Sequence, residues 1–238
     1  MKKSVLLLIV VALFCGSGNC NAQLLNSAKK FVAGKTGGYS EKEAVDAIKE
    51  ALVKGTNEGV KLVSAKDGYL GNMEIKIPFP ADAQIIEKKL RSMGFGKNVD
   101  QAVVAMNRAA EDAGKEAGPI FVTAITSMSV SDGVAIVTGP DDAATIYLKK
   151  STTADLTVKF KPVIKNSLDK VYATKYWADL VKLYNKIPGA KKMNPDLLAY
   201  VTGKAIDGLF VMVAKEELKI RKDPASQTTA LLKKVFGK

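Results

Sequence analysis

Helix-start signals recur along this chain at short intervals, and they limit the fold to one built mainly from helices. Three pairs of residues have the capping-box spacing, in which an N-cap residue precedes an acid or amide by three positions: Ser40 with Glu43, Asn98 with Gln101, and Ser129 with Asp132. Other starts combine a proline with a cap residue or with acids that suit the positive end of a helix dipole: Pro80, Pro140 to Asp142, Asn194 to Asp196, and Asp223-Pro224. We therefore expect about eight to ten helices.

Apolar residues between these signals repeat at three- and four-residue steps, as they do on one face of a helix. Three such faces are evident: Ile48, Leu52, Val60 and Val63; Leu156, Phe160, Val163, Ile164 and Leu168; and Trp177, Leu180, Val181 and Tyr184. No internal repeat is detectable. The pattern predicts an all-α fold, a single-domain multi-helix bundle with one short extended segment near 72–80.

That extended segment reads NMEIKIPFP, and its apolar residues alternate instead of following a helical period. Ile75, Ile77 and Phe79 fall on one side, which is the pattern of an extended chain. The two prolines exclude a central strand. We expect the segment to lay these three side chains onto the helices, either as one short strand or as the rim of a groove.

The N-terminus has the three parts of a secretory signal peptide. Lys2 and Lys3 supply the positive start, residues 5–14 the apolar stretch, and Ala22 the small residue before a cleavage site ahead of Gln23. The residues before Cys15 and Cys20 do not fit a lipoprotein signal, and no later apolar run is long enough to be a membrane helix. The predicted layout is a signal peptide at 1–22, a flexible or loosely helical segment at 23–39, and one all-α domain at 40–238.

The residue types that the mature chain lacks exclude several classes of chemistry. The chain contains no His, and both cysteines would leave with the signal peptide. A Ser-His-Asp triad, a Cys nucleophile and an ordinary zinc site are therefore excluded. No acids have the spacing of a calcium loop, so we expect no metal and no cofactor. Carboxylate, lysine or tyrosine chemistry remains open.

The stretch AMNRAAED, residues 105–112, places polar residues in a helix of small apolar ones. The alanines should let another helix approach closely, and Gly118-Pro119 should interrupt the helix. Arg108 with Asp112 has the spacing of a surface ion pair, as does Glu111 with Lys115. The alternative interpretation is that Asn107, Arg108 and Glu111 turn inward as a polar cluster.

A second segment, AIDGLFVMVA at 205–214, is apolar almost all round and should be buried. Asp207 lies inside it, three residues after Lys204. Because a buried carboxylate must be paired or protonated, we expect Arg108 to grip Asp207 with two hydrogen bonds. The same groups can instead form a ligand site or a catalytic site. No residue is assigned as catalytic.

Several separate segments resemble domain-of-unknown-function family 4197, from about residue 40 to the C-terminus. They are IKIPFP, MNRAAE, FVTAITSMSVSD, TGPDDAATIYLKKSTTADLTVKFKPVI, YVTGKAIDGLF and KIRKDPASQTTALLKKVFG. The resemblance implies one helical domain of an exported bacterial protein. The family has no established activity, so it implies no catalytic residue. Gln227 stands where the family favours Arg.

The formal charge of +12 favours anionic partners. Nucleic acid does not suit an exported protein, so we expect lipid head groups or cell-wall polymers. The segment TTALLKKVFGK, residues 228–238, is amphipathic and suits either weak contact with an anionic membrane surface or docking on the core.

The leading hypothesis is a bacterial envelope protein, periplasmic or secreted, that is not an enzyme and binds an apolar or amphipathic ligand or a partner protein. The pocket would lie between the 99–128 and 195–221 helices, with Ile75, Ile77 and Phe79 at its rim. Arg108 would orient an anionic head group there. One alternative is an envelope scaffold without a pocket. The other is a carboxylate-based hydrolase or lyase that uses Glu111 and Asp207.

Overall fold

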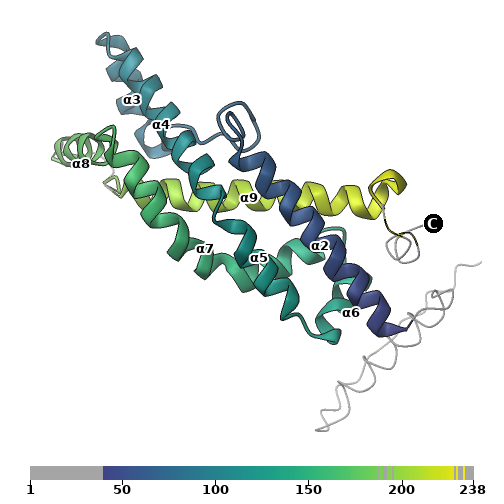
Figure 1. Ribbon diagram of the computed structural model, residues 1–238. Helices are drawn as coiled ribbons and strands as arrows, with labels where there is room; N and C mark the ends of the chain where they lie inside the picture. Colours follow the sequence, from purple (N-terminus) through teal and green to yellow (C-terminus); the bar gives the residue numbers. More distant parts are fainter. Residues whose placement is uncertain are drawn as a thin grey trace, which may run out of the picture. The chain divides into compact units, whose positions relative to one another are not determined.

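The computed structural model describes residues 40–186, 188–189, 192–194, 196–227, 229 and 233. This part of the chain contains eight α-helices and two short 3-10 turns, and no strand (Figure 1). The helices are α2 (Glu41–Ser64), α3 (Gln84–Ser92), α4 (Gly96–Gly114), α5 (Ala117–Thr126), α6 (Val130–Thr138), α7 (Ala143–Asp169), α8 (Ala173–Tyr184) and α9 (Leu197–Lys222). The 3-10 turns are Ala81–Ala83 and Pro224–Ser226. The all-α prediction is confirmed. The predicted signal peptide, the 23–39 segment and most of 228–238 lie outside the described residues.

Three of the predicted helix starts are formed by the expected side chains, those of Ser40, Ser129 and Asp223. Ser40 and Ser129 each accept a hydrogen bond from the backbone three residues on, and Glu43 and Asp132 complete the two capping boxes. The sequence pattern places the cap of α9 at Asn194, but the helix is capped by Asp196, whose carboxylate accepts from the Ala199 amide. Asp223 likewise caps the turn that follows α9.

The predicted Asn98 cap is wrong. The α4 helix begins two residues earlier, at Gly96, and no side chain caps it. Gly94 lies just before it with a φ of +88°, which reverses the chain between α3 and α4. Because the tight turn itself starts the helix, the local Asn98–Gln101 spacing is not used for capping.

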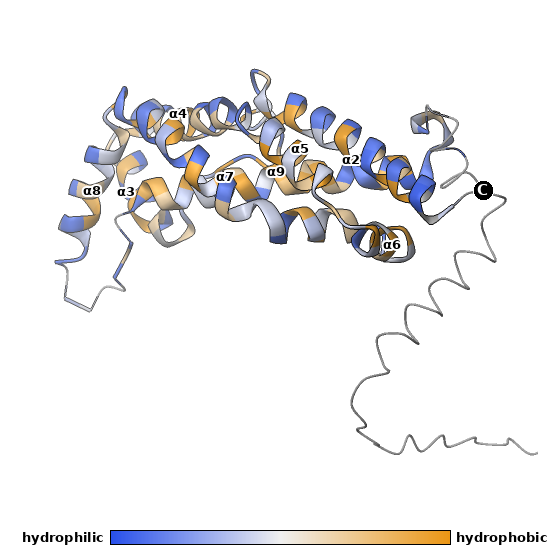
Figure 2. Cartoon of the chain, turned by 60° about the horizontal axis from the view of Figure 1, so that its bottom comes forward, coloured by the Kyte–Doolittle hydropathy of each residue, from blue (hydrophilic) through white to orange (hydrophobic). Residues whose placement is uncertain are grey.

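The core is centred on α9, which packs against α2 on one side and α7 on the other, and α7 packs in turn against α4. Three alanines of the α4–α5 stretch are completely buried, as their helical spacing predicts: Ala110, Ala113 and Ala117. Ala109, outside that stripe, is buried as well. The break after Gly114 separates α4 from α5, whose first turn holds Pro119. Figure 2 shows hydrophilic segments beside hydrophobic ones along the labelled helices, as expected where one face is buried.

The α9 helix extends well beyond the apolar segment 205–214 that the sequence predicts to be buried. Its length and mean hydropathy alone are those of a helix that can cross a membrane. Of its most apolar window, 56% is buried among the other helices. The expectation that no later apolar run reaches this length is therefore corrected.

The segment between α2 and α3 forms a series of turns instead of a strand. Ile75, Ile77 and Phe79 are all buried, with exposed fractions of 4%, 1% and 8%, so their alternation does place them on one inward side. A side chain at Gly68 would come within 2.3 Å of the Leu62 carbonyl oxygen, so the first turn after α2 requires glycine. We call residues 65–80 the connecting loop.

Candidate functional site

Asn107 holds the connecting loop against α4. Its side-chain oxygen accepts a hydrogen bond from the Ile77 amide, and its side-chain nitrogen donates to the Ile77 carbonyl, both at 2.8 Å. Asn107 is completely buried. One amide side chain thus replaces the strand partner that Ile77 lacks, which explains why an extended segment can lie in the core without a sheet.

Glu111 lies one turn further along α4 and holds the other end of the loop. One of its carboxylate oxygens accepts hydrogen bonds from the Tyr69 and Leu70 amides, each at 3.1 Å. Its other oxygen lies 2.6 Å from Arg108. Arg108 also reaches Asp67, at 2.7 Å. The hydrogen bonds to Glu111 and Asp67 raise the pKa of Arg108 further above its ordinary value. A buried carboxylate is thereby both hydrogen-bonded and paired.

Tyr69 connects the same loop to α9. The side chain is completely buried, and its hydroxyl donates to the Ala205 carbonyl oxygen at 2.5 Å. Gly208 makes room for the ring, since a Cβ there would lie 2.6 Å from a Tyr69 ring carbon. Burial, and secondarily the negative charge of Glu111, raises the pKa of Tyr69 far above its usual value near 10.

This pKa predicts a specific alkaline instability. Above pH 10 the unfolded chain releases the Tyr69 proton while the folded chain keeps it, so stability present below pH 10 is lost as the pH rises. We expect the free energy of unfolding of the wild type to fall by about 1.4 kcal/mol per pH unit more steeply than that of Tyr69→Phe. Urea titrations between pH 9 and about 11.5 measure both slopes. Parallel curves would contradict the assignment.

The predicted Arg108–Asp207 pair is wrong. Arg108 pairs with Glu111 and Asp67, as described above, and Asp207 lies on the exposed side of α9, 3.3 Å from Lys149. Lys204 is also exposed. The inward polar cluster therefore contains Asn107, Glu111 and the partly buried Arg108, while Lys204 and Asp207 lie apart from it.

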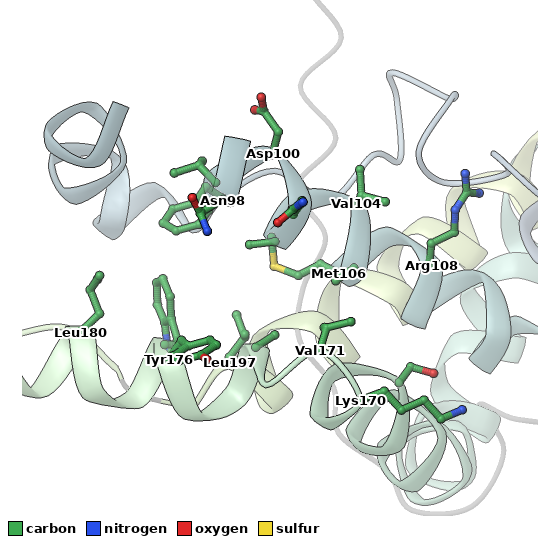
Figure 3. Close-up of a pocket in the computed structure, with 18 of the residues that line it drawn as sticks. Asn98, Asp100, Val104, Met106, Arg108, Lys170, Val171, Tyr176, Leu180 and Leu197 are labelled. Carbon is green, nitrogen blue, oxygen red and sulfur yellow. The ribbon is translucent and has the colours of Figure 1, made fainter. Parts of the chain in front are cut away.

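An open groove of about 1060 Å³ lies between α4 on one side and the end of α7 with α8 on the other (Figure 3). The middle of the groove is apolar and is lined by Ala102, Ala105, Met106, Val171, Trp177 and Leu197. The sequence predicts a pocket between α4–α5 and α9. The α4 wall agrees with that prediction, but α9 contributes only its first residue, Leu197, to the lining.

The two ends of the groove differ in chemistry. Arg108 and Lys170 lie at one end, and Asn98 and Leu180 at the other (Figure 3). Asp112 and Ser167 also line the first end, with the Ser167 hydroxyl 3.4 Å from the Asp112 carboxylate. Lys170 lines the groove and forms no ion pair with any residue that the structure describes, since the nearby Asp169 pairs with Lys165. The groove thus has an apolar middle, with the cations Arg108 and Lys170 at one end and Asn98 and Asp100 toward the other.

Trp177 is a wall residue that the sequence analysis assigned to a helix face but not to a site. Its ring meets Phe79 edge to face, with 5.4 Å between the ring centres. Its indole nitrogen is buried without a hydrogen-bond partner among the described residues. Of the three residues expected at the rim, Phe79 lines the groove, whereas Ile75 and Ile77 are buried in the core. Trp177 and Leu180, three residues apart on one apolar face of α8, both line the groove. That three-residue apolar step is the sequence feature that indicates this wall.

Glu217 is a second buried carboxylate, which the sequence pattern does not indicate. Glu217 of α9 accepts hydrogen bonds from the Ala144 and Thr145 amides at the start of α7, at 3.0 and 2.8 Å. Arg221 pairs with it at 2.7 Å. The sequence predicts that Asp141 and Asp142 stabilise the start of α7 through the helix dipole. Asp142 makes no capping bond, and Asp141 pairs with Lys222, so α7 is capped from another helix.

The described residues contain no group of three acids, histidines or cysteines that could hold a metal ion. Glu111 is engaged with the loop and Asp207 faces solvent, and neither lines the groove. The arrangement therefore supplies a shaped apolar surface with a polar end, without paired carboxylates across a cleft.

The fold and the groove define an all-α helical protein with an open groove that is apolar in its middle. The chain belongs to the family described as "Protein of unknown function (DUF4197)", which it matches over residues 38–237. The family resemblance inferred from the sequence is thereby confirmed. No curated protein sequence and no solved structure matches the chain.

Proposed function

We propose that this protein binds a single-chain amphipathic molecule in the groove between α4 and α8. The observation that carries this is the apolar middle of a roughly 1060 Å³ groove that ends at Arg108 and Lys170. Ligand sites typically combine a mostly apolar lining with a few polar groups at one place, which fix the orientation of the ligand. The apolar chain would lie along Ala105 and Trp177, and the head group would lie at the Arg108 end.

The polar end suits a head group that carries hydrogen-bond acceptors and a single negative charge. A guanidinium has five N–H donors, and two of those of Arg108 are directed to Glu111 and Asp67. Lys170 supplies further donors, whereas the single O–H of Ser167 is directed to Asp112. Asp112 lies in the same wall, 2.9 Å from Lys115, and its charge disfavours a head group with more than one negative charge.

Binding is favoured over the two alternatives by the same geometry. A scaffold without a pocket would have a closed interface where α4 faces α8, and an enzyme of the predicted kind would need Glu111 and Asp207 to face each other.

We further propose that the protein is exported to the bacterial envelope, which the signal-like residues 1–22 support. The proposed amphipathic ligand would be bound in that compartment.

Trp177 gives a direct test, because it is the single tryptophan of the chain. Titration with sodium laurate, a single-chain anionic amphiphile, should produce a saturable change in tryptophan emission. Ala105→Phe fills the middle of the groove and should weaken this binding at least about tenfold, by blocking a contact worth more than about 1.4 kcal/mol. Ala154→Phe, at an exposed position of α7, is the matched control and should bind as the wild type does.

Two outcomes would contradict the proposal: no saturable change with the wild type, or equal binding by Ala105→Phe and the wild type. Native mass spectrometry of protein purified from its own envelope fraction adds a second readout. A retained small molecule that is lost in Ala105→Phe would identify the chemical class of the natural ligand.

A further inference from the structure

The turn between α3 and α4 presents large apolar side chains to solvent at one end of the groove. Ile85, Met93 and Phe95 are 68%, 60% and 47% exposed. The α3 helix has no buried residue, and only its other face, with Ile86 and Leu90, packs on the core. We call residues 84–97 the α3–α4 tip. Exposed apolar side chains gathered in one short segment mark an interaction surface.

The same tip carries unbalanced positive charge. Lys88, Lys89 and Lys97 are exposed and form no ion pair with any described residue. Glu87 and Asp100 are both paired with Arg91, at 3.0 and 2.8 Å. Residues 84–97 thus carry a formal charge of +3, and the three lysines lie in the same short segment as the exposed apolar residues.

The opposite side of the groove has a related surface on α8. Tyr172 and Tyr176 are 63% and 65% exposed, and Lys175 and Lys182 lie on the same helix. One acid, Asp179, is exposed among them. Phe95 of the tip and Tyr176 of α8 both line the groove, and α3 and α8 lie at the same end of the protein in both views (Figures 1 and 2). The two surfaces thus flank one opening.

We propose that the α3–α4 tip and α8 dock on an anionic lipid bilayer, so that the opening of the groove faces the membrane surface. Lysines would contact anionic head groups, while Met93 and Ile85 enter the boundary between head groups and acyl chains. Exposed tyrosines are suited to that boundary, because the ring is apolar and the hydroxyl is polar. The exposed apolar residues favour a bilayer over a nucleic acid, whose backbone would contact the lysines alone.

This docking deepens the proposed function, because it gives the amphipathic ligand a route between bilayer and groove. It does not depend on the segment 228–238, where the sequence analysis placed membrane contact. The tip contacts lipid through Met93 and the lysines, and none of these lines the groove. Docking and ligand binding can therefore be disrupted separately.

Co-sedimentation of the full-length mature protein with lipid vesicles tests the docking. We expect binding to an equal mixture of phosphatidylglycerol and phosphatidylcholine, and much weaker binding to phosphatidylcholine alone. Each lysine near an anionic surface changes binding about fivefold, so Lys88→Gln with Lys97→Gln should weaken it about 25-fold. Met93→Ser should weaken it at least about threefold. The matched controls are Lys159→Gln with Lys161→Gln and Val158→Ser, at exposed positions in the middle of α7.

Equal losses in the tip variants and the α7 controls would overturn the proposal, because they would reflect net charge alone. So would unchanged binding of Met93→Ser, which would mean that the tip is a general polyanion site. The Trp177 titration with laurate separates the two proposals. If the lysine variant binds laurate as the wild type does but loses vesicles, docking is supported. If the wild type binds vesicles but not laurate, the ligand-binding proposal fails and docking stands.

Discussion

Replacement of Glu111 by alanine is expected to lower the free energy of unfolding by about 3–5 kcal/mol. The carboxylate is 4% exposed and accepts two backbone hydrogen bonds from the connecting loop. Its loss leaves the buried Tyr69 amide without a partner and removes one of the two carboxylates that pair with Arg108. Urea denaturation monitored by circular dichroism measures the change.

Two variants define what this loss means. Glu111→Gln keeps an oxygen that can accept from the loop but places an amide against Arg108, so its effect should fall between those of the wild type and Glu111→Ala. Asp207→Ala is the exposed counterpart, since the Asp207 and Lys149 side chains are 60% and 54% exposed, and it should cost under about 1 kcal/mol. If Asp207→Ala were as destabilising as Glu111→Ala, the assignment of buried and exposed carboxylates would be wrong.

The helices and most of their caps follow from local sequence, because a capping box and a three- and four-residue apolar step need only neighbouring residues. Ser40 and Ser129 are predicted and found for this reason. The burial of Ile75 and Ile77 also follows from an alternation that is local. The reversal at Gly94 shows the limit, because a tight turn started α4 ahead of the expected cap.

The Arg108–Asp207 prediction failed because apolar composition does not tell which face of a helix points outward. The α9 helix buries thirteen residues, yet Gly203, Asp207 and Val211 form an exposed stripe at four-residue steps. Val211 is 40% exposed although it is apolar. Asp207 therefore faces solvent. Because Val211 and Gly203 on the same exposed stripe are not polar, the sequence does not show that this face of α9 points outward.

The sequence indicates the polar cluster on α4 but not its partners, since these lie 30 to 42 residues away along the chain. Asn107 and Glu111 bond to the backbone of the connecting loop, and a backbone amide has no sequence signature of its own. The groove likewise depends on contacts between segments that are distant in the sequence. It needs α8 to diverge from α4, and the turn that redirects it contains Tyr172 at a φ of +56°.

Replacement of Glu217 by alanine should be comparably destabilising, at about 3–5 kcal/mol, because the same physical situation recurs at the other end of the bundle. Glu217 and Arg221 have side chains only 5% and 10% exposed. The carboxylate bonds to two amides and to the Thr145 hydroxyl at the first turn of α7, where the helix dipole is positive. Guanidinium denaturation compares this variant with the wild type.

Glu216 is the matched control, since it precedes Glu217 on the same helix and its side chain is 11% exposed. Its carboxylate pairs with Lys219, whose side chain is 56% exposed, so Glu216→Ala should cost about 1 kcal/mol. Equal losses in the two variants would show that burial alone, and not the capping of α7, sets the effect. A larger loss in Glu217→Ala would mean that α9 fixes α7 through a charged cap, as α4 fixes the connecting loop through Glu111. The walls of the groove, α4 and α7–α8, would then each be held by one buried carboxylate that lies outside the groove.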